Sequence, residues 1–223
     1  MRVLSPLEAR VLGVLVEKQH TVPDSYPLSL NTLVLGCNQK TARSPVIETS
    51  DAEVQLALDG LKSLSLTFEG SGSRVVKYEH NMARVLGLPG ASVAILTVLM
   101  LRGPQTTAEL RVNCERLHRF ADLSSVEGFL DELAGKVTPM VVKLPRAPGA
   151  REARWAHLMC GDVPPEWLVA APGAGGDAGG FSMSLGEVAA LKVEQTRMAA
   201  ELTVLRELVH RMAAELGIKV EGV

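Results

Sequence analysis

In the early part of the chain, apolar residues recur every three or four positions, which is the spacing of helices with one buried face. One helix is predicted over residues 5–18 and a second over 28–35, where Gly36 supplies a stop signal. Ser50 and Glu53 have the spacing of a capping box, so a third helix is expected to begin there. The pattern therefore predicts three consecutive helices.

After the third helix the pattern changes to two short extended segments around a turn. Residues 66–69 and 75–78 flank the Gly/Ser-rich residues 70–72, as the two strands of a β-hairpin would. Three helices followed by a two-stranded ribbon form the winged-helix variant of the helix-turn-helix, in which the third helix usually reads the DNA groove. We therefore predict a winged helix over residues 1–88.

The same order of elements recurs further along the chain, which indicates a repeat. Its helices are predicted over 91–101, over 106–117 and from a capping box at Ser124 and Glu127 onward. Residues 140–144 and 153–158 are expected to pair as a second hairpin. A second winged helix is therefore predicted over 89–160, and two small domains agree with the length of 223 residues.

Beyond the repeat, residues 161–183 are rich in glycine and proline, as flexible linkers are. Residues 184–217 then follow a heptad pattern, which predicts a coiled-coil helix. Its seam positions are Val188, Leu191, Gln195, Met198, Leu202, Leu205, Val209, Met212 and Leu216. We expect this helix to form a homodimer; the alternative is that it folds back onto its own winged helices. The predicted fold class is thus mainly α with small β-hairpins (α+β): tandem winged helices and a coiled coil.

Composition and charge narrow the functions open to such a chain. With 47% hydrophobic and 22% charged residues it can bury a core, which excludes wholesale disorder. Its 23 Lys and Arg against 25 Asp and Glu give a net charge of −2, which excludes the broadly basic surface of a nonspecific nucleic-acid coat. With no secretory signal and no apolar run long enough to span a membrane, we expect a cytoplasmic protein with reduced cysteines.

The polar positions of both predicted third helices are mostly acidic, which argues against groove reading by these helices. Basic and amide residues lie instead in the connection before the first third helix and around the hairpins. The candidate DNA-binding residues are Asn38, Gln39, Lys40, Arg43, Arg74 and Lys77 in the first unit and Lys143, Arg146, Arg151 and Arg154 in the second. We expect them to contact the phosphates of duplex DNA through the wings.

Two classes of function remain open. The first is a DNA-binding or transcription-regulatory protein that acts without catalysis; the second is a protein-interaction module with acidic third helices and a dimerising coiled coil. The connection also has a purely structural interpretation. In that interpretation Asn38 and Gln39 satisfy backbone groups at the end of the second helix, and Arg43 pairs with Glu48 or Asp51.

Candidate chemistry is sparse, and no cofactor, metal or catalytic residue is predicted. Four zinc ligands could come from Cys114, His118, His157 and Cys160. These residues lack the tight Cys-x-x-Cys pair of a closed site. We expect buried thiols and surface imidazoles instead. Cys37 lies close to Lys40, which could activate a thiol, although packing at a helix end is the commoner role of such a cysteine.

Several motifs together resemble the YceH-like family of bacterial proteins, whose members are described as a domain of unknown function. In the first unit these motifs are Leu7-Glu8-Ala9-Arg10-Val11-Leu12, Glu17-Lys18-Gln19, Tyr26-Pro27-Leu28-Ser29, Cys37-Asn38-Gln39-Lys40-Thr41 with Arg43 and Pro45, and Arg74-Val75 with Lys77-Tyr78-Glu79. In the second they are Leu101-Arg102-Gly103, Gln105-Thr106, Glu109-Leu110-Arg111, Val141-Val142, Pro148-Gly149 and His157-Leu158. The resemblance covers residues 4 to about 161. It implies tandem winged helices and a helical tail of variable sequence, and it brings no catalytic residue.

Overall fold

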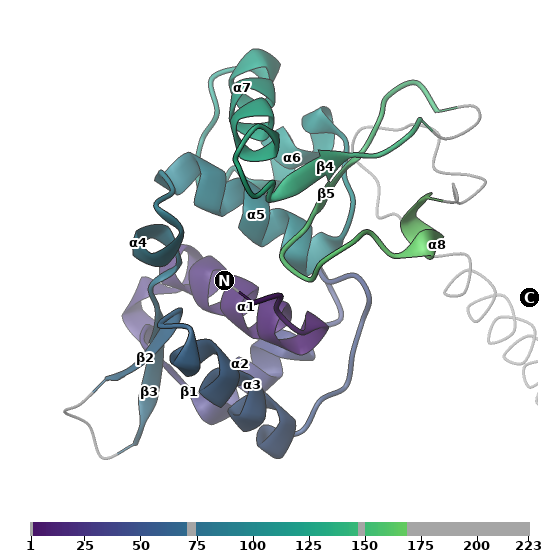
Figure 1. Ribbon diagram of the computed structural model, residues 1–223. Helices are drawn as coiled ribbons and strands as arrows, with labels where there is room; N and C mark the ends of the chain where they lie inside the picture. Colours follow the sequence, from purple (N-terminus) through teal and green to yellow (C-terminus); the bar gives the residue numbers. More distant parts are fainter. Residues whose placement is uncertain (1, 71–74, 147–149, 169–223) are drawn as a thin grey trace, which may run out of the picture. The chain divides into compact units, whose positions relative to one another are not determined.

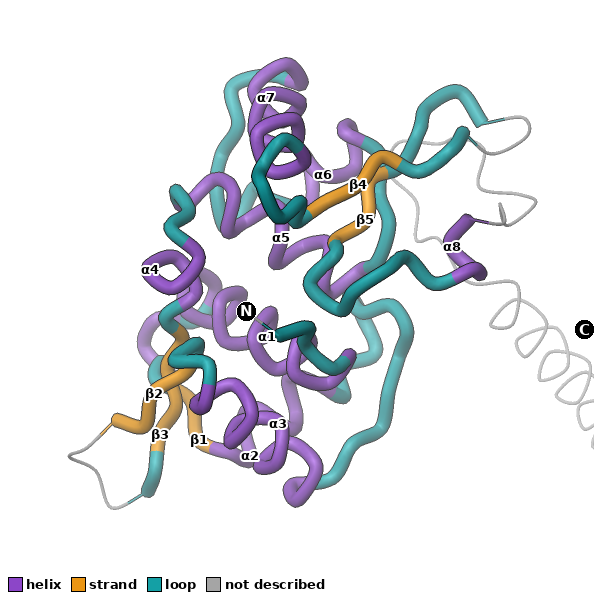
Figure 2. The backbone as a smooth tube through the Cα atoms, in the orientation of Figure 1, coloured by secondary structure: helices purple, strands orange, loops and turns teal. Residues whose placement is uncertain are grey.

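The structure is a computed structural model that describes residues 2–70, 75–146 and 150–168, and this part of the chain is a mixed α+β protein (Figures 1 and 2). Within it, no helix has both the length and the apolar character needed to cross a membrane. The predicted coiled coil over 184–217, with all nine seam residues, lies outside the described residues, and so does most of the predicted linker.

Capping boxes begin two of the three helices in the first half, as their sequences predict. Helix α1 (Pro6–Thr21) starts after Ser5, whose hydroxyl accepts from the backbone N–H of Glu8 while the Glu8 carboxylate accepts from the backbone N–H of Ser5. Helix α3 (Asp51–Ser63) starts in the same way from Ser50 and Glu53. Between them lie a 3₁₀ turn, η1 (Pro23–Ser25), and helix α2 (Leu30–Cys37), which the side chain of Ser29 caps.

A three-stranded antiparallel sheet closes the first half, with the order β1-β3-β2. Strands β2 (Thr67–Gly70) and β3 (Lys77–His80) form the predicted hairpin, each two residues or less from its expected place. Strand β1 (Leu28–Ser29) pairs with β3, although its residues were assigned to the start of the second helix. The prediction placed that helix start two residues too early, because a two-residue strand continues the local apolar pattern and gains its hydrogen bonds only from a distant partner.

The second half repeats this order after a short helix that the sequence pattern did not indicate, α4 (Met82–Leu86). Its elements are α5 (Gly90–Arg102), α6 (Thr107–Asn113), α7 (Leu123–Ala134), β4 (Val141–Lys143) and β5 (Trp155–His157), followed by α8 (Pro165–Leu168). Gln105 forms an isolated antiparallel bridge with Trp155 of β5, the place that β1 takes beside β3 in the first half. The two halves therefore share one connectivity.

The capping box predicted at Ser124 and Glu127 is wrong. Helix α7 is capped by Asp122, whose Oδ1 accepts from the backbone N–H of Ser125 at 2.7 Å and from its hydroxyl at 2.6 Å. A carboxylate two residues upstream takes the cap because it is a strong N-cap acceptor placed three residues before a free backbone donor. Ser124 consequently lies inside the first turn of the helix and is exposed.

One apolar core runs through both halves, with α1 between α2 and α3 on one side and α5 on the other (Figure 1). All residues from Glu8 to Val16 in α1 are buried, and so are all residues from Ala91 to Leu101 in α5. The helices approach closely at Gly13, where an added Cβ would lie 3.0 Å from the side chain of Leu101. Helix α1 is thus a shared core element, buried on more than one face.

Two helical glycines offer a test of this packing. In Gly36→Ala the new Cβ would lie 2.6 Å from Cγ1 of Val14 in α1, so we expect a loss of about 1–3 kcal/mol in the free energy of unfolding. In the control Gly128→Ala, on α7, the new Cβ meets no atom within 4 Å, and helix propensity should add about 0.5–1 kcal/mol. Urea unfolding of both variants measures the two effects. Equal stabilisation by both alanines would contradict the packing of α2 on α1.

Candidate functional site

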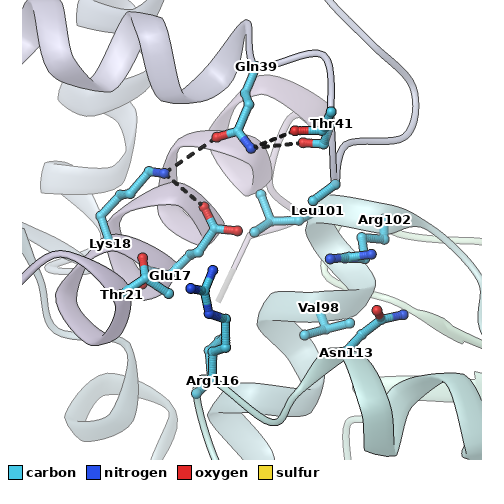
Figure 3. A pocket seen from close by; sticks show the side chains of 12 residues that line it. Glu17, Lys18, Thr21, Gln39, Thr41, Val98, Leu101, Arg102, Asn113 and Arg116 are labelled. Atoms are coloured by element: carbon cyan, nitrogen blue, oxygen red, sulfur yellow. Dashed lines mark hydrogen bonds and ion pairs between the residues drawn. The ribbon is translucent and has the colours of Figure 1, made fainter. Parts of the chain in front are cut away.

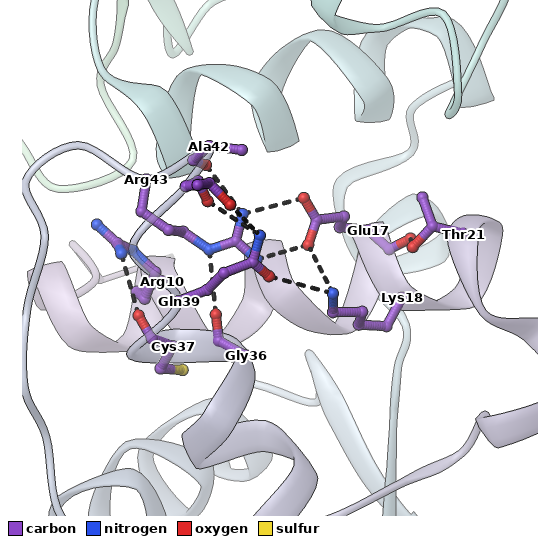
Figure 4. Close-up of polar contacts among 10 residues, drawn as sticks. Arg10, Glu17, Lys18, Thr21, Gly36, Cys37, Gln39, Ala42 and Arg43 are labelled. Carbon is purple, nitrogen blue, oxygen red and sulfur yellow. Dashed lines mark hydrogen bonds and ion pairs between the residues drawn. The ribbon is translucent and has the colours of Figure 1, made fainter. Parts of the chain in front are cut away.

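The connection from α2 to α3 is held by its own amide side chains. The Asn38 side chain donates to the carbonyl of Thr49 and accepts from the N–H of Thr49, both at 2.8 Å. Gln39 donates to the carbonyl of Thr41 at 3.0 Å and accepts from Nζ of Lys18 at 3.4 Å (Figure 4). The structure therefore gives Asn38 and Gln39 backbone partners, as the structural interpretation expects, but these partners are Thr49 and Thr41 of the connection itself and not groups at the end of the second helix.

Arg43 is a buried structural residue rather than a surface cation. Its side chain is 0% exposed; Nε donates to the carbonyl of Gly36 at 3.1 Å and Nη1 to that of Ala42 at 2.9 Å. The two terminal nitrogens donate to the carboxylate of Glu17 in α1 at 3.0 and 2.5 Å. The expected partners Glu48 and Asp51 are thus wrong, because the guanidinium points back to α1. In this position Arg43 cannot reach a DNA phosphate, and it leaves the set of candidate contacts.

This ion pair lowers the pKa of Glu17. Burial by itself raises the pKa of Glu17, but the hydrogen bond and charge of Arg43, with a smaller effect of Lys18, outweigh it and hold the pKa below its ordinary value. Arg10 lies beside the pair and donates to the carbonyls of Cys37 at 3.3 Å and Pro45 at 2.6 Å. Burial raises the pKa of the Cys37 thiol to about 11, so this cysteine packs as a neutral thiol and is not activated.

The remaining first-half candidates lie on different elements. Lys40 is exposed, whereas Lys77 lies half-buried on β3, paired in register with Ser29 and Gly70. Arg74 lies outside the described residues. Among the described residues, Lys40 and Lys77 are thus the first-half candidate cations with side chains that remain at the surface, fully for Lys40 and in part for Lys77.

The second hairpin carries the four candidate cations of that half. Lys143 ends β4 with its ammonium 5.4 Å from the ring centroid of Trp155, a cation–π contact. Arg146 and Arg151 are exposed and Arg154 is half-buried. Within the described ranges none of these four forms an ion pair, so their charges remain available to an anionic partner. The strands of the two hairpins lie on different sides of the packed halves (Figure 1).

Most of the exposed charged residues on the third helices are acidic in both halves. Asp51, Glu53 and Asp59 are exposed on α3, and Glu127, Asp131 and Glu132 are exposed on α7. The one lysine of α3, Lys62, is engaged with Glu69 of β2 at 2.7 Å. Helix α3 also presents Leu56, 71% exposed, between its acidic residues.

The cysteine and histidine residues considered as metal ligands have separate surroundings. The ring of His118 packs on Phe120 and that of the buried His157 on Trp167, and Cys160 donates a weak hydrogen bond to the carbonyl of Ser5. Burial raises the pKa of Cys114 to about 12 and lowers that of His157 to about 4. Among the residues that the structure describes, His, Cys, Asp and Glu side chains nowhere gather in a group of three.

The sequence reasoning missed a cleft of about 240 Å³ between the two halves, which we call the inter-repeat cleft (Figure 3). Lys18 near the end of α1, Arg102 at the end of α5 and Arg116 after α6 line it, and Glu17 is the one acidic residue in its lining. Lys18 and Arg102 hold equivalent places in the two repeats, at the ends of the first helices. The repeat in the sequence could have indicated that Lys18 and Arg102 are equivalent. It could not show that they lie close together, because that depends on the packing of α1 on α5.

Known proteins match this chain along its whole length. A family model described as "Protein of unknown function, DUF480" matches residues 4–150. A UPF0502 protein of Burkholderia vietnamiensis is 65% identical over 100% of this chain and 93% of its own length, and one of Burkholderia pseudomallei is 66% identical over 99% and 92%. The chain belongs to the DUF480 family. The resemblance to the YceH-like family is thereby confirmed.

The DUF480 match spans α1 to β4 and therefore includes the whole first repeat and all of the second except β5. The UPF0502 relatives also extend over the heptad segment 184–217, since they cover the full chain. In this DUF480 protein, segments 17–19, 37–41 and 101–103, which contribute to the resemblance, meet at the inter-repeat cleft. The family description assigns no reaction and no ligand to any of them.

The Arg43–Glu17 pair leads to a test of stability. Arg43→Ala leaves a partly buried carboxylate and two backbone carbonyls without the donor that Arg43 supplies, so we expect a loss of about 3 kcal/mol in the free energy of unfolding. Lys40→Ala, on the exposed side of the same connection, should change it by less than about 0.5 kcal/mol. Urea unfolding near neutral pH measures both values, and similar losses in the two variants would refute the structural role.

The same variant makes a pH prediction with a definite sign. Because the folded-state pKa of Glu17 is lowered, its ionisation stabilises the fold above the ordinary pKa of 4.5, and this contribution is lost as pH falls through the lowered value. Protonated Glu17 carries no charge for Arg43 to neutralise. The stability difference between wild type and Arg43→Ala should therefore shrink below about pH 4.5 in unfolding curves.

Proposed function

We propose that the protein is a tandem winged-helix protein of regulatory type that binds duplex DNA without catalysis. The connectivity supports the winged-helix interpretation. In the first half, strand β1 lies in the chain between the first and second helices and pairs with the hairpin after the third helix. In the second half, Gln105 bridges to β5 in the same place.

The observation that carries DNA binding is the basic hairpin of the second half. Lys143, Arg146, Arg151 and Arg154 supply four cations that form no ion pair within the described part of the chain, on β4 and on the residues that lead into and out of its loop to β5. Arginine and lysine on such a ribbon bind phosphates and release counterions. The acidic exposed face of α7 would be repelled by the same phosphates. The proposed contact is therefore made by the wing and positions the duplex without reading its bases.

Salt dependence tests this proposal. The triple variant Lys143→Gln, Arg146→Gln and Arg151→Gln should weaken binding to random duplex DNA and flatten the plot of log affinity against log salt, by about 0.9 in slope for each phosphate that the protein no longer neutralises. Fluorescence anisotropy across a salt series measures the slope. The control variant Arg84→Gln, Arg111→Gln and Arg119→Gln removes the same charge from exposed positions outside the hairpin and should keep the wild-type slope. Equal slopes in the two variants, or no wild-type binding at low salt, would overturn the proposal.

A second candidate function is a protein-interaction module, and the exposed apolar residues of the first half favour it. Leu56 of α3 is 71% exposed beside acidic neighbours, and Leu35 of α2 is 67% exposed. A helix face that combines carboxylates with a large aliphatic side chain fits a partner that is basic and apolar better than it fits DNA. This second candidate function would be favoured if the protein does not bind duplex DNA in the salt series.

In either function we propose that the heptad segment 184–217 supplies a parallel homodimer. Leu202→Glu with Leu205→Glu puts charges into the seam and should convert the dimer to a monomer in light scattering. Ala200→Glu with Ala214→Glu adds the same charge at outward heptad positions and should leave the mass unchanged. A wild-type protein with the mass of a monomer would exclude the dimer.

A further inference from the structure

The inter-repeat cleft has an excess of positive charge that the fold itself does not neutralise. Arg102 and Arg116 line it and form no hydrogen bond or ion pair with any described residue. The carboxylate of Glu17 is already bound by Arg43 from behind and lies 3.6 Å from Nζ of Lys18. The lining therefore presents three cations against one carboxylate that is in use.

Arg102 in particular is desolvated without a matching anion. Its side chain is half-buried, and burial lowers the pKa of its guanidinium, with Glu17 acting in the opposite direction. Arg43 lies close enough to lower that pKa further. A cation in such a position gains more from a bound anion than a fully solvated one does, because part of its hydration is already lost.

The rest of the lining suits a small organic molecule. Gln39, Thr41 and Asn113 bring amide and hydroxyl groups to the wall, interspersed with apolar surface from Val98 and Leu101 (Figure 3). A volume of about 240 Å³ is below the range of roughly 300–1,000 Å³ that is usual for drug-sized ligands. It admits a compact molecule and excludes a nucleic-acid segment from full burial.

We propose that the inter-repeat cleft binds the phosphate group of a small phosphorylated metabolite, held by Arg102, Arg116 and Lys18. A phosphate dianion matches three cations in the lining of one cleft better than a single carboxylate does, and guanidinium groups bind its oxygens in the bidentate manner. The ligand would contact both repeats at once, since Lys18 comes from α1 and the two arginines from the second half. It would thereby stabilise the packing of α1 on α5.

Isothermal titration of the full chain with inorganic phosphate and with glycerol phosphate, at constant ionic strength set by chloride, tests the proposal. We expect both to bind wild type, and Arg102→Gln with Arg116→Gln to weaken them by about tenfold or more. Arg116→Gln alone, at an exposed position, should fold normally and weaken binding in the same direction. The control Arg111→Gln with Arg119→Gln, exposed arginines on either side of Arg116 in sequence and outside the cleft, should bind as wild type does.

The hairpin variant Lys143→Gln, Arg146→Gln and Arg151→Gln separates this site from a DNA-phosphate site. It should retain phosphate binding, whereas Arg102→Gln with Arg116→Gln should retain the salt slope of DNA binding. Phosphate binding that survives in the cleft variant, is lost in the hairpin variant, or is absent from wild type would overturn the proposal. Phosphate binding without any DNA binding would support the cleft and remove the proposed function, so the two can fail separately.

Discussion

The burial of helix α1 from several sides is the constraint on which the rest of the structure depends. Its residues from Glu8 to Val16 contact α2 and α3 on one side and α5 on the other, so neither half has a complete core without it. Apolar surface removed from water on both sides of one helix couples the two halves energetically. The same helix carries Glu17 and Lys18 at its polar end, and its position therefore fixes both the α2–α3 connection and the inter-repeat cleft.

In the α2–α3 connection, polar side chains bind to α1 and thereby take a structural role. Arg43 reaches back to Glu17 across 26 residues of sequence, and its guanidinium is satisfied by one carboxylate and two carbonyls. A buried pair of this kind contributes little net stability relative to an apolar pair, but breaking it is costly, so it specifies one position of the connection relative to α1. Most of the polar residues from Asn38 to Arg43, which were candidate DNA contacts, instead hold the α2–α3 connection in place against α1.

Local signals in the sequence predicted most of the helices and both hairpins, because a capping box or an apolar stripe is complete within a few residues. The capping boxes at Ser5 and Ser50 are examples. The predictions that were wrong concern features that depend on a partner distant in sequence or on competition between neighbouring residues. Strand β1 exists only through β3, and Asp122 displaces the cap expected at Ser124. The inter-repeat cleft could not be predicted at all, since an apolar stripe shows that a face is buried and does not say which helix covers it.

The two halves share a connectivity but distribute charge differently, and this difference separates the possible sites. In the first half Arg43 and Lys62 are committed to carboxylates, which leaves isolated lysines on the surface. In the second half the hairpin cations and Arg102 have no carboxylate partner within the described residues. Lys and Arg balance Asp and Glu in each half, nine against nine in residues 1–90 and again in residues 91–170, and the net charge of −2 comes from residues 171–223. The halves therefore differ in which charges are paired and not in their sums. The two proposed anion sites, for DNA and for a small phosphate, therefore draw most of their cations from the second half, and α1 supplies the one lysine that lines the cleft from the first.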